Sequence, residues 1–98
     1  MLIHIVCWKY RSDIDKTARE EHRARLTALR SVIPEIRRLD IGEDMLHLDR
    51  SFDTALFAEF ADRAALDIYT DHPEHQKVAA FGREISEQVV SVDFIRPE

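Results

Sequence analysis

The residues with the clearest capacity for chemistry lie in one stretch, Tyr69-Thr70-Asp71-His72-Pro73-Glu74-His75. It places a phenol and two imidazoles, groups that donate hydrogen bonds and move protons, beside a proline. Pro73 disfavours helical backbone at His72 and is itself favoured in the first turn of a helix, so the stretch predicts two helices meeting at a bend. Such a bend directs Tyr69 and His75 toward a common point. The alternative is a helix-to-helix corner whose polar side chains are solvated.

Two further histidines interrupt apolar surfaces. Residues 2–10 are β-branched and aromatic, which predicts a strand with His4 in the middle of the face formed by even-numbered residues. Residues 14–31 have apolar positions three and four apart, which predicts a helix whose apolar stripe contains His22. We expect His4 and His22 to share a cavity with Tyr69 and His75. In the alternative, His22 is sealed in the core while His4 points into the interior of a dimer.

The elements that must position these residues follow one another in a simple order. Asp13 is the expected N-cap of the first helix, and Asp62 that of a second helix that runs to the Tyr69 bend. Strands are predicted over residues 36–41, 53–60 and 89–95, and a last helical piece runs from Pro73 to Phe81, before Gly82. The connection over residues 43–52 is the least regular part and carries His47 as a surface residue. The order is β-α-β-β-α-β.

This order predicts a single α+β domain over residues 1–98, a ferredoxin-like fold in which both helices cover one face of an antiparallel sheet. Three of the four strands are nevertheless apolar on both faces. Large exposed apolar surfaces usually mark an interface. The sequence therefore predicts a two-fold homodimer in which two sheets enclose an interior, forming an α+β barrel.

Composition excludes several other classes of protein. The 98 residues carry a formal net charge of −5, with basic and acidic residues intermixed, so no basic surface for nucleic acid is expected. The single Cys7 cannot form an intrachain disulfide or a cysteine-based zinc finger. No apolar segment approaches the ~20 residues that span a bilayer, and no signal sequence opens the chain, so we expect a cytoplasmic protein with no membrane partner.

Several short motifs, taken in order, resemble the stress-responsive A/B barrel (Dabb, dimeric α+β barrel) family. The motifs are His4-Ile5-Val6, Val32-Ile33-Pro34 followed by Gly42, Ser51-Phe52-Asp53, the Tyr-x-x-His-Pro-x-His pattern of residues 69–75, and Val92-Asp93-Phe94. In the third of these, Ser and Phe replace the Gly and Tyr of the family. The similarity covers nearly the whole chain. It implies the dimeric barrel fold that the strand pattern also predicts.

The resemblance also implies roles for particular residues. In plant polyketide cyclases of the olivetolic acid cyclase type, the Tyr and the last His of the motif do acid–base work without a cofactor. By that similarity, Tyr69 and His75 are the candidate catalytic residues, and His4 and His72 fall on the family's other histidines. The cyclases have an aromatic residue near His22. With His4, His22 and His72 as candidate substrate-binding residues, a more polar pocket is implied here.

Three functions remain open at this point. The first is a small-molecule-binding protein linked to stress or metabolism. The second is a cofactor-free cyclase or lyase in which His75 takes a proton and Tyr69 stabilises the developing oxyanion. The third is a metal site built from His4, His22, His72 and His75, although the spacing across Pro73 and the lack of an evident carboxylate nearby argue against it. We expect no cofactor and no metal.

Overall fold

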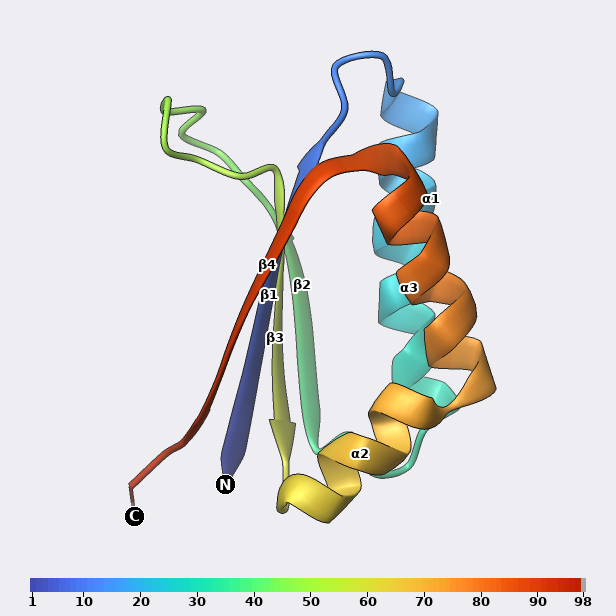
Figure 1. Ribbon diagram of the computed structural model, residues 1–98, viewed down its shortest axis with the longest axis vertical. Coiled ribbons are helices and arrows are strands. Elements are labelled where there is room, and N and C mark those ends of the chain that lie inside the picture. Colours follow the sequence, from blue (N-terminus) through green and yellow to red (C-terminus); the bar gives the residue numbers. More distant parts are fainter. Residues whose placement is uncertain (98) are drawn as a thin grey trace.

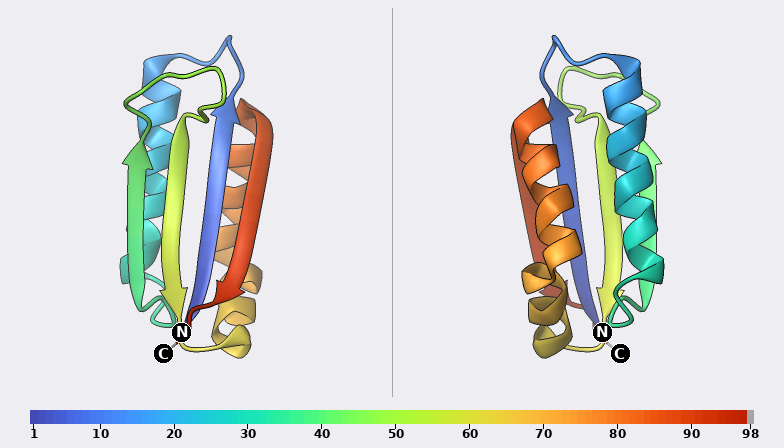
Figure 2. Two further views of the ribbon diagram at one scale, coloured as in Figure 1. Left: turned by 90° about the vertical axis from the view of Figure 1, so that its left-hand side faces the viewer. Right: turned by 90° about the vertical axis from the view of Figure 1, so that its right-hand side faces the viewer.

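The computed structural model describes residues 1–97 as one antiparallel sheet covered by helices on one side (Figures 1 and 2). The strands lie in the order β2-β3-β1-β4. The elements in chain order are β1 (Leu2–Tyr10), α1 (Lys16–Ala28), a 3₁₀ turn (Leu29–Ser31), β2 (Arg38–Glu43), β3 (Thr54–Phe60), α2 (Arg63–Asp71), α3 (Pro73–Ile85) and β4 (Ser86–Ile95). The predicted ferredoxin-like α+β fold is confirmed. The second helical region consists of two helices, α2 and α3, that meet at the bend predicted before Pro73.

The two faces of the sheet differ in what covers them. Even-numbered residues of β1, including Trp8 and Tyr10, face the helices together with Leu56 and Phe60 of β3, and these side chains form the buried core. The opposite face has no helix over it, as the left view of Figure 2 shows. Alternation along β1 predicts these two sets of residues but not which of them faces the helices.

The ends of α1 and α2 follow from capping. The side chain of Asp15 accepts a hydrogen bond from the backbone N–H of Ala18, so Asp15 is the N-cap of α1. The prediction that Asp13 caps this helix is wrong, because Asp13 instead pairs with Arg11. Asp62 caps α2 as predicted, through the N–H of Ala65. Among residues 1–97, no helix combines the length and the apolar character needed to cross a bilayer.

Helix α3 continues past the point where the sequence predicts its end. Gly82 lies inside the helix, and the helix reaches Ile85. A Cβ atom at Gly82 would lie 2.8 Å from Nε2 of His22 and 3.0 Å from Nε1 of Trp8, so only glycine lets α3 approach α1 and the sheet this closely. Gly82 therefore serves close packing instead of helix termination.

The uncovered face of the sheet is apolar along β4 and most of β1. Val90, Val92 and Phe94 of β4 expose 42%, 61% and 45% of their surface, although they lie beside the apolar odd-numbered residues of β1. Ile3 is the exception on this face, with 1% exposed. It pairs with Glu59 and Phe94 on its two neighbouring strands, and Arg96 forms an ion pair with Glu59. An apolar sheet face of this kind is the surface that a partner sheet would cover.

Candidate functional site

A cavity of about 270 Å³ lies between the helix-facing side of the sheet and the bend where α2 meets α3. Its lining is mostly apolar, with a small set of polar groups, as is usual for small-molecule sites. The lining residues are His4, Val6, Trp8, Leu26, Leu56, Tyr69, Thr70, His75, Ala79, Arg83, Val89 and Ser91. Three of the five predicted site residues, His4, Tyr69 and His75, are therefore brought together.

The bend sets the position of His75. Helix α2 ends before Pro73, which leaves the carbonyl of Thr70 without an intrahelical partner. Nδ1 of His75 lies 3.0 Å from this carbonyl oxygen. Because a carbonyl only accepts, Nδ1 carries the proton and the lone pair is on Nε2. Burial lowers the pKa of His75, and the positive charge of Arg83 acts in the same direction, so the neutral imidazole is favoured.

Tyr69 lies directly against His75. The two ring centroids are 4.2 Å apart, with the planes tilted by 40°, and the ring of Tyr69 also contacts Phe60 and His4. Only 1% of Tyr69 is exposed, and this burial raises its pKa, so the phenol keeps its proton. Its hydroxyl has no hydrogen-bond partner among residues 1–97. A protonated hydroxyl without a partner, on the wall of a cavity, is a donor available to a ligand.

His4 enters the cavity from the middle of β1 and is oriented by the neighbouring strand. In the β1–β4 register His4 is opposite Asp93, and Nδ1 of His4 lies 2.5 Å from Oδ1 of Asp93. The carboxylate accepts this hydrogen bond, so in neutral His4 the lone pair is again on Nε2. Asp93 thus fixes the ring and its tautomer, as a carboxylate does beside many functional histidines.

His22 lies on the same side of the sheet but outside the cavity lining. It is 1% exposed. Trp8 lines the cavity and separates it from His22, with the centroids of the Trp8 and His22 rings 4.9 Å apart. The Tyr10 hydroxyl donates to Oγ1 of Thr54 at 2.9 Å and accepts from Nδ1 of His22 at 2.7 Å. Burial, assisted by nearby Arg23, lowers the pKa of His22 to about 4. The expectation that His22 is sealed in the core is therefore met, and it does not share the cavity. The accompanying expectation that His4 points into the interior of a dimer is wrong, because the even-numbered face of β1 packs against the helices.

The remaining histidines have structural surroundings. His72 is the N-cap of α3, and its Nδ1 accepts a hydrogen bond from the N–H of Glu74 at 3.1 Å. It is not among the residues that line the cavity. His47 is on the surface of the loop between β2 and β3, as expected, 3.5 Å from Asp44. Within residues 1–97, no group of three or more histidine, cysteine or acidic side chains is placed to hold a metal ion. The four-histidine metal site is not assembled.

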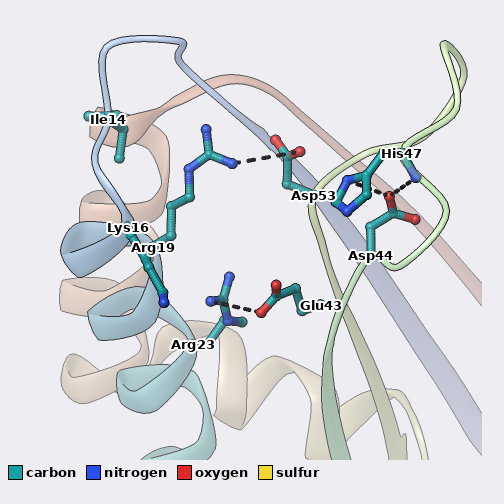
Figure 3. A pocket seen from close by; sticks show the side chains of 8 residues that line it. All are labelled: Ile14, Lys16, Arg19, Arg23, Glu43, Asp44, His47 and Asp53. Atoms are coloured by element: carbon teal, nitrogen blue, oxygen red, sulfur yellow. Dashed lines mark hydrogen bonds and ion pairs between the residues drawn. The ribbon is translucent and has the colours of Figure 1, made fainter.

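A second hollow, of about 400 Å³, lies between α1 and the loop between β2 and β3 (Figure 3). Its lining is charged rather than apolar. Arg23 pairs with Glu43 at 3.1 Å, and Arg19 approaches Asp53 at 3.9 Å, as Figure 3 shows. These ion pairs connect α1 to the two ends of the loop. Because their charges neutralise one another, few unpaired charged groups remain to bind a ligand.

Three residues escape the sequence-based prediction: Trp8 and Arg83, which line the cavity, and Asp93, which lies outside the lining and holds His4. Asp93 stands in the Val92-Asp93-Phe94 motif, but its contact with His4 depends on strand register. Trp8 shares the even-numbered face of β1 with His4, which is the signal that could have found it. Arg83 lies beyond Gly82, in the last turn of a helix that the sequence predicts to end earlier.

Comparison with known proteins identifies the family of the chain. The profile of the stress responsive A/B barrel domain family matches residues 2–96. The chain belongs to this family. A comparison of the Dabb chain with curated proteins finds no match.

Solved structures share the fold. A dimeric ferredoxin-like protein from Bacteroides fragilis NCTC 9343 is 27% identical, with a TM-score of 0.84, over 95% of this chain and 93% of that one. A dimeric ferredoxin-like protein from Thermobifida fusca is 24% identical, with a TM-score of 0.86, over 95% and 88%. A hydroxynitrile lyase from Passiflora edulis is 23% identical, with a TM-score of 0.89, over 99% and 94%. The first two are described as proteins of unknown function.

Proposed function

We propose that the cavity binds a small carbonyl compound and that His75 removes a proton from the carbon beside the carbonyl group, without a cofactor. The observation that carries the proposal is the hydrogen bond from His75 Nδ1 to the Thr70 carbonyl. It leaves Nε2 of His75 as a proton acceptor, and the ring of Tyr69, whose hydroxyl is an unpartnered donor, lies against that of His75 in the lining of the same apolar cavity.

The reaction step follows from these two groups. The C–H bond breaks, its proton moves to Nε2 of His75, and its electron pair passes to the carbonyl to form an enolate. The Tyr69 hydroxyl donates a hydrogen bond to the oxygen on which negative charge develops. Burial keeps His75 neutral and Tyr69 protonated near pH 7, which are the states this step requires. The proton on Nε2 of His75 is replaced by one from solvent, and its transfer to the carbon restores the ketone and completes an exchange.

Two observations bear on the outcome of that step. The Passiflora edulis relative is a hydroxynitrile lyase, so this fold supports an enzyme activity, and a lyase or cyclase outcome fits the same pair of groups. The mostly apolar lining also suits ligand binding without turnover, in a stress-related or metabolic role, which is the second candidate function. The two candidates differ in whether bound ligand loses a proton.

Proton exchange separates these functions. We expect the wild-type protein to accelerate the exchange of the α-protons of 4-phenyl-2-butanone for deuterium in D₂O, followed by NMR. His75→Gln should lose ~10²–10⁴ of the rate because it removes the base. Tyr69→Phe should lose about tenfold, the effect of one hydrogen bond. His47→Gln, a change of an exposed loop histidine, is the matched control and should keep the wild-type rate.

Two results would contradict the acid–base role. Binding of the ketone by the wild-type protein without accelerated exchange would favour the ligand-binding function. A rate in His75→Gln equal to that of the His47→Gln control would show that another group takes the proton.

The protein is also proposed to form a homodimer through the uncovered sheet face. Support comes from the exposed apolar residues of β4, Val90, Val92 and Phe94, and from the dimeric relatives of Bacteroides fragilis and Thermobifida fusca. Each 100 Å² of apolar surface buried contributes about 2.5 kcal/mol. A face of several hundred Å² therefore favours association.

A charge on this face tests the dimer. Val92→Asp should give monomers in sedimentation velocity at micromolar concentration, because an unpaired carboxylate would be buried between the sheets. Val32→Asp changes a valine of similar exposure that lies outside the sheet, and should leave the sedimentation coefficient unchanged. A wild-type protein that sediments as a monomer would contradict the proposal.

A further inference from the structure

The charge in the cavity has one sign. Arg83 is the only lysine, arginine, aspartate or glutamate among the lining residues. Asp93, which lies on the same side of the sheet, is already held by His4, with its Oδ1 2.5 Å from Nδ1 of His4. The protein as a whole carries a formal net charge of −5, so the single positive charge of Arg83 in the cavity is opposite in sign to the net charge of the protein.

Arg83 also lacks the pairing that the arginines of the charged hollow have. Arg19 approaches Asp53, and Arg23 pairs with Glu43, whereas no carboxylate among residues 1–97 lies within ion-pair distance of Arg83. An arginine guanidinium presents several N–H donors in a planar fork that matches a carboxylate. At Arg83 this fork is exposed and has no acidic partner.

Helix geometry directs this guanidinium back toward the proton acceptor. Arg83 follows His75 by eight residues on α3, which is about 12 Å along the axis. Side chains on a helix lean toward its N-terminus, so the long side chain of Arg83 reaches back over the cavity toward His75. The effect of the Arg83 charge on the pKa of His75 agrees with that approach.

We propose that Arg83 binds the carboxylate of the substrate, and that the substrate is a small keto acid with an apolar body. The carboxylate lies at the guanidinium, the apolar part lies against Trp8 and Leu56, and the ketone lies between Tyr69 and His75. This inference rests on the proposed function for the ketone, but the carboxylate contact is independent of proton transfer.

A matched pair of probes separates the two parts. 4-Oxo-4-phenylbutanoate carries a ketone and a carboxylate, and 4-oxo-4-phenylbutanamide has nearly the same shape without the charge. We expect the wild-type protein to bind the acid about 10- to 100-fold more tightly than the amide in NMR titrations at fixed ionic strength, as hydrogen bonds to charged groups contribute. Arg83→Gln should remove this preference, and Arg83→Lys should keep part of it.

The control for the change in net charge is Arg37→Gln, because Arg37 is an exposed arginine outside the cavity lining. It should keep the full preference for the acid. As a second measurement, the acid should raise the pKa of His75 in the wild-type protein, because its negative charge offsets that of Arg83, and should raise it no less in Arg37→Gln.

Each outcome has a distinct meaning. Equal binding of acid and amide by the wild-type protein, or a preference for the acid that survives Arg83→Gln, would overturn the role of Arg83. The exchange of α-protons in the neutral amide tests His75 alone. Failure of that exchange would contradict the proposed function, even where Arg83→Gln abolishes the preference for the acid.

Discussion

The protein contains two histidine–tyrosine pairs on the same side of one sheet, and they differ in whether the tyrosine hydroxyl is hydrogen-bonded within the protein. In the pair of His22 and Tyr10, the tyrosine hydroxyl both donates and accepts within the protein. In the pair of His75 and Tyr69, the rings are in contact but the tyrosine hydroxyl has no partner among residues 1–97. Trp8 stands between the two pairs. Burial alone does not distinguish the two tyrosines, because both are almost fully buried.

The two pairs accordingly have different costs and uses. A buried hydroxyl that is satisfied on both sides stabilises the fold and specifies one packing arrangement. A hydroxyl on a cavity wall that has no partner in the protein is free to meet a ligand or water. His22 and Tyr10 therefore serve stability, and we propose that His75 and Tyr69 serve a ligand.

The largest expected effect is on the pH dependence of stability. The pKa of His22 is about 4 in the folded protein and about 6.5 in the unfolded chain, so the unfolded state binds the proton more tightly. Stability is therefore fully present above pH 6.5 and is lost as the pH falls toward 4, by about 3 kcal/mol. Urea denaturation between pH 7.5 and 4 should show this loss, and His22→Gln should flatten most of it. An unchanged slope in His22→Gln would contradict the assignment.

The two glycines provide a matched test of the packing around His22. A Cβ at Gly82 would lie 2.8 Å from His22, so Gly82→Ala should cost about 1–3 kcal/mol of unfolding free energy through overpacking. A Cβ at Gly42 would meet nothing within 4 Å, and Gly42→Ala should be neutral or stabilise by up to about 1 kcal/mol. Equal effects of the two substitutions would show that α3 does not pack tightly on His22.

Removing each tyrosine hydroxyl gives a smaller effect with opposite expectations. Tyr10→Phe should cost about 1–2 kcal/mol, because it removes the hydrogen bonds to His22 and Thr54 and leaves their buried atoms unpaired. Tyr69→Phe should change the unfolding free energy by less than about 0.5 kcal/mol, because no hydrogen bond within the protein is lost. A loss in Tyr69→Phe as large as that in Tyr10→Phe would remove the distinction.

The sequence predicts the framework of the cavity better than its contents. Alternation along residues 2–10 correctly assigns His4 and Trp8 to one face, because the strand period is short and unambiguous. The bend at Pro73 correctly predicts that Tyr69 and His75 meet, because proline acts locally on the backbone.

What depends on contacts between distant elements is not predicted. The helical stripe places His22 on the inner side of α1 but does not tell whether a cavity or Trp8 lies opposite. The predicted helix end at Gly82 is wrong, because glycine also occurs where two elements approach closely. As a result, the sequence does not identify Arg83 as a residue of α3 that lines the cavity. The partner of His4 depends on the register of β4. These are tertiary effects that no local pattern contains.

The most direct test of the central claim compares the unfolding free energies of His75→Gln and His22→Gln at pH 7.5, with protein from the same preparations used for proton exchange. We expect the unfolding free energy of His75→Gln to stay within about 1 kcal/mol of that of the wild-type protein, because His75 is only partly buried and makes one hydrogen bond to a helix end. His22→Gln should lose about 2–4 kcal/mol, because a packed and hydrogen-bonded core residue is replaced. A loss in His75→Gln as large as that in His22→Gln, with ketone binding unchanged, would show that His75 serves packing and would contradict the account.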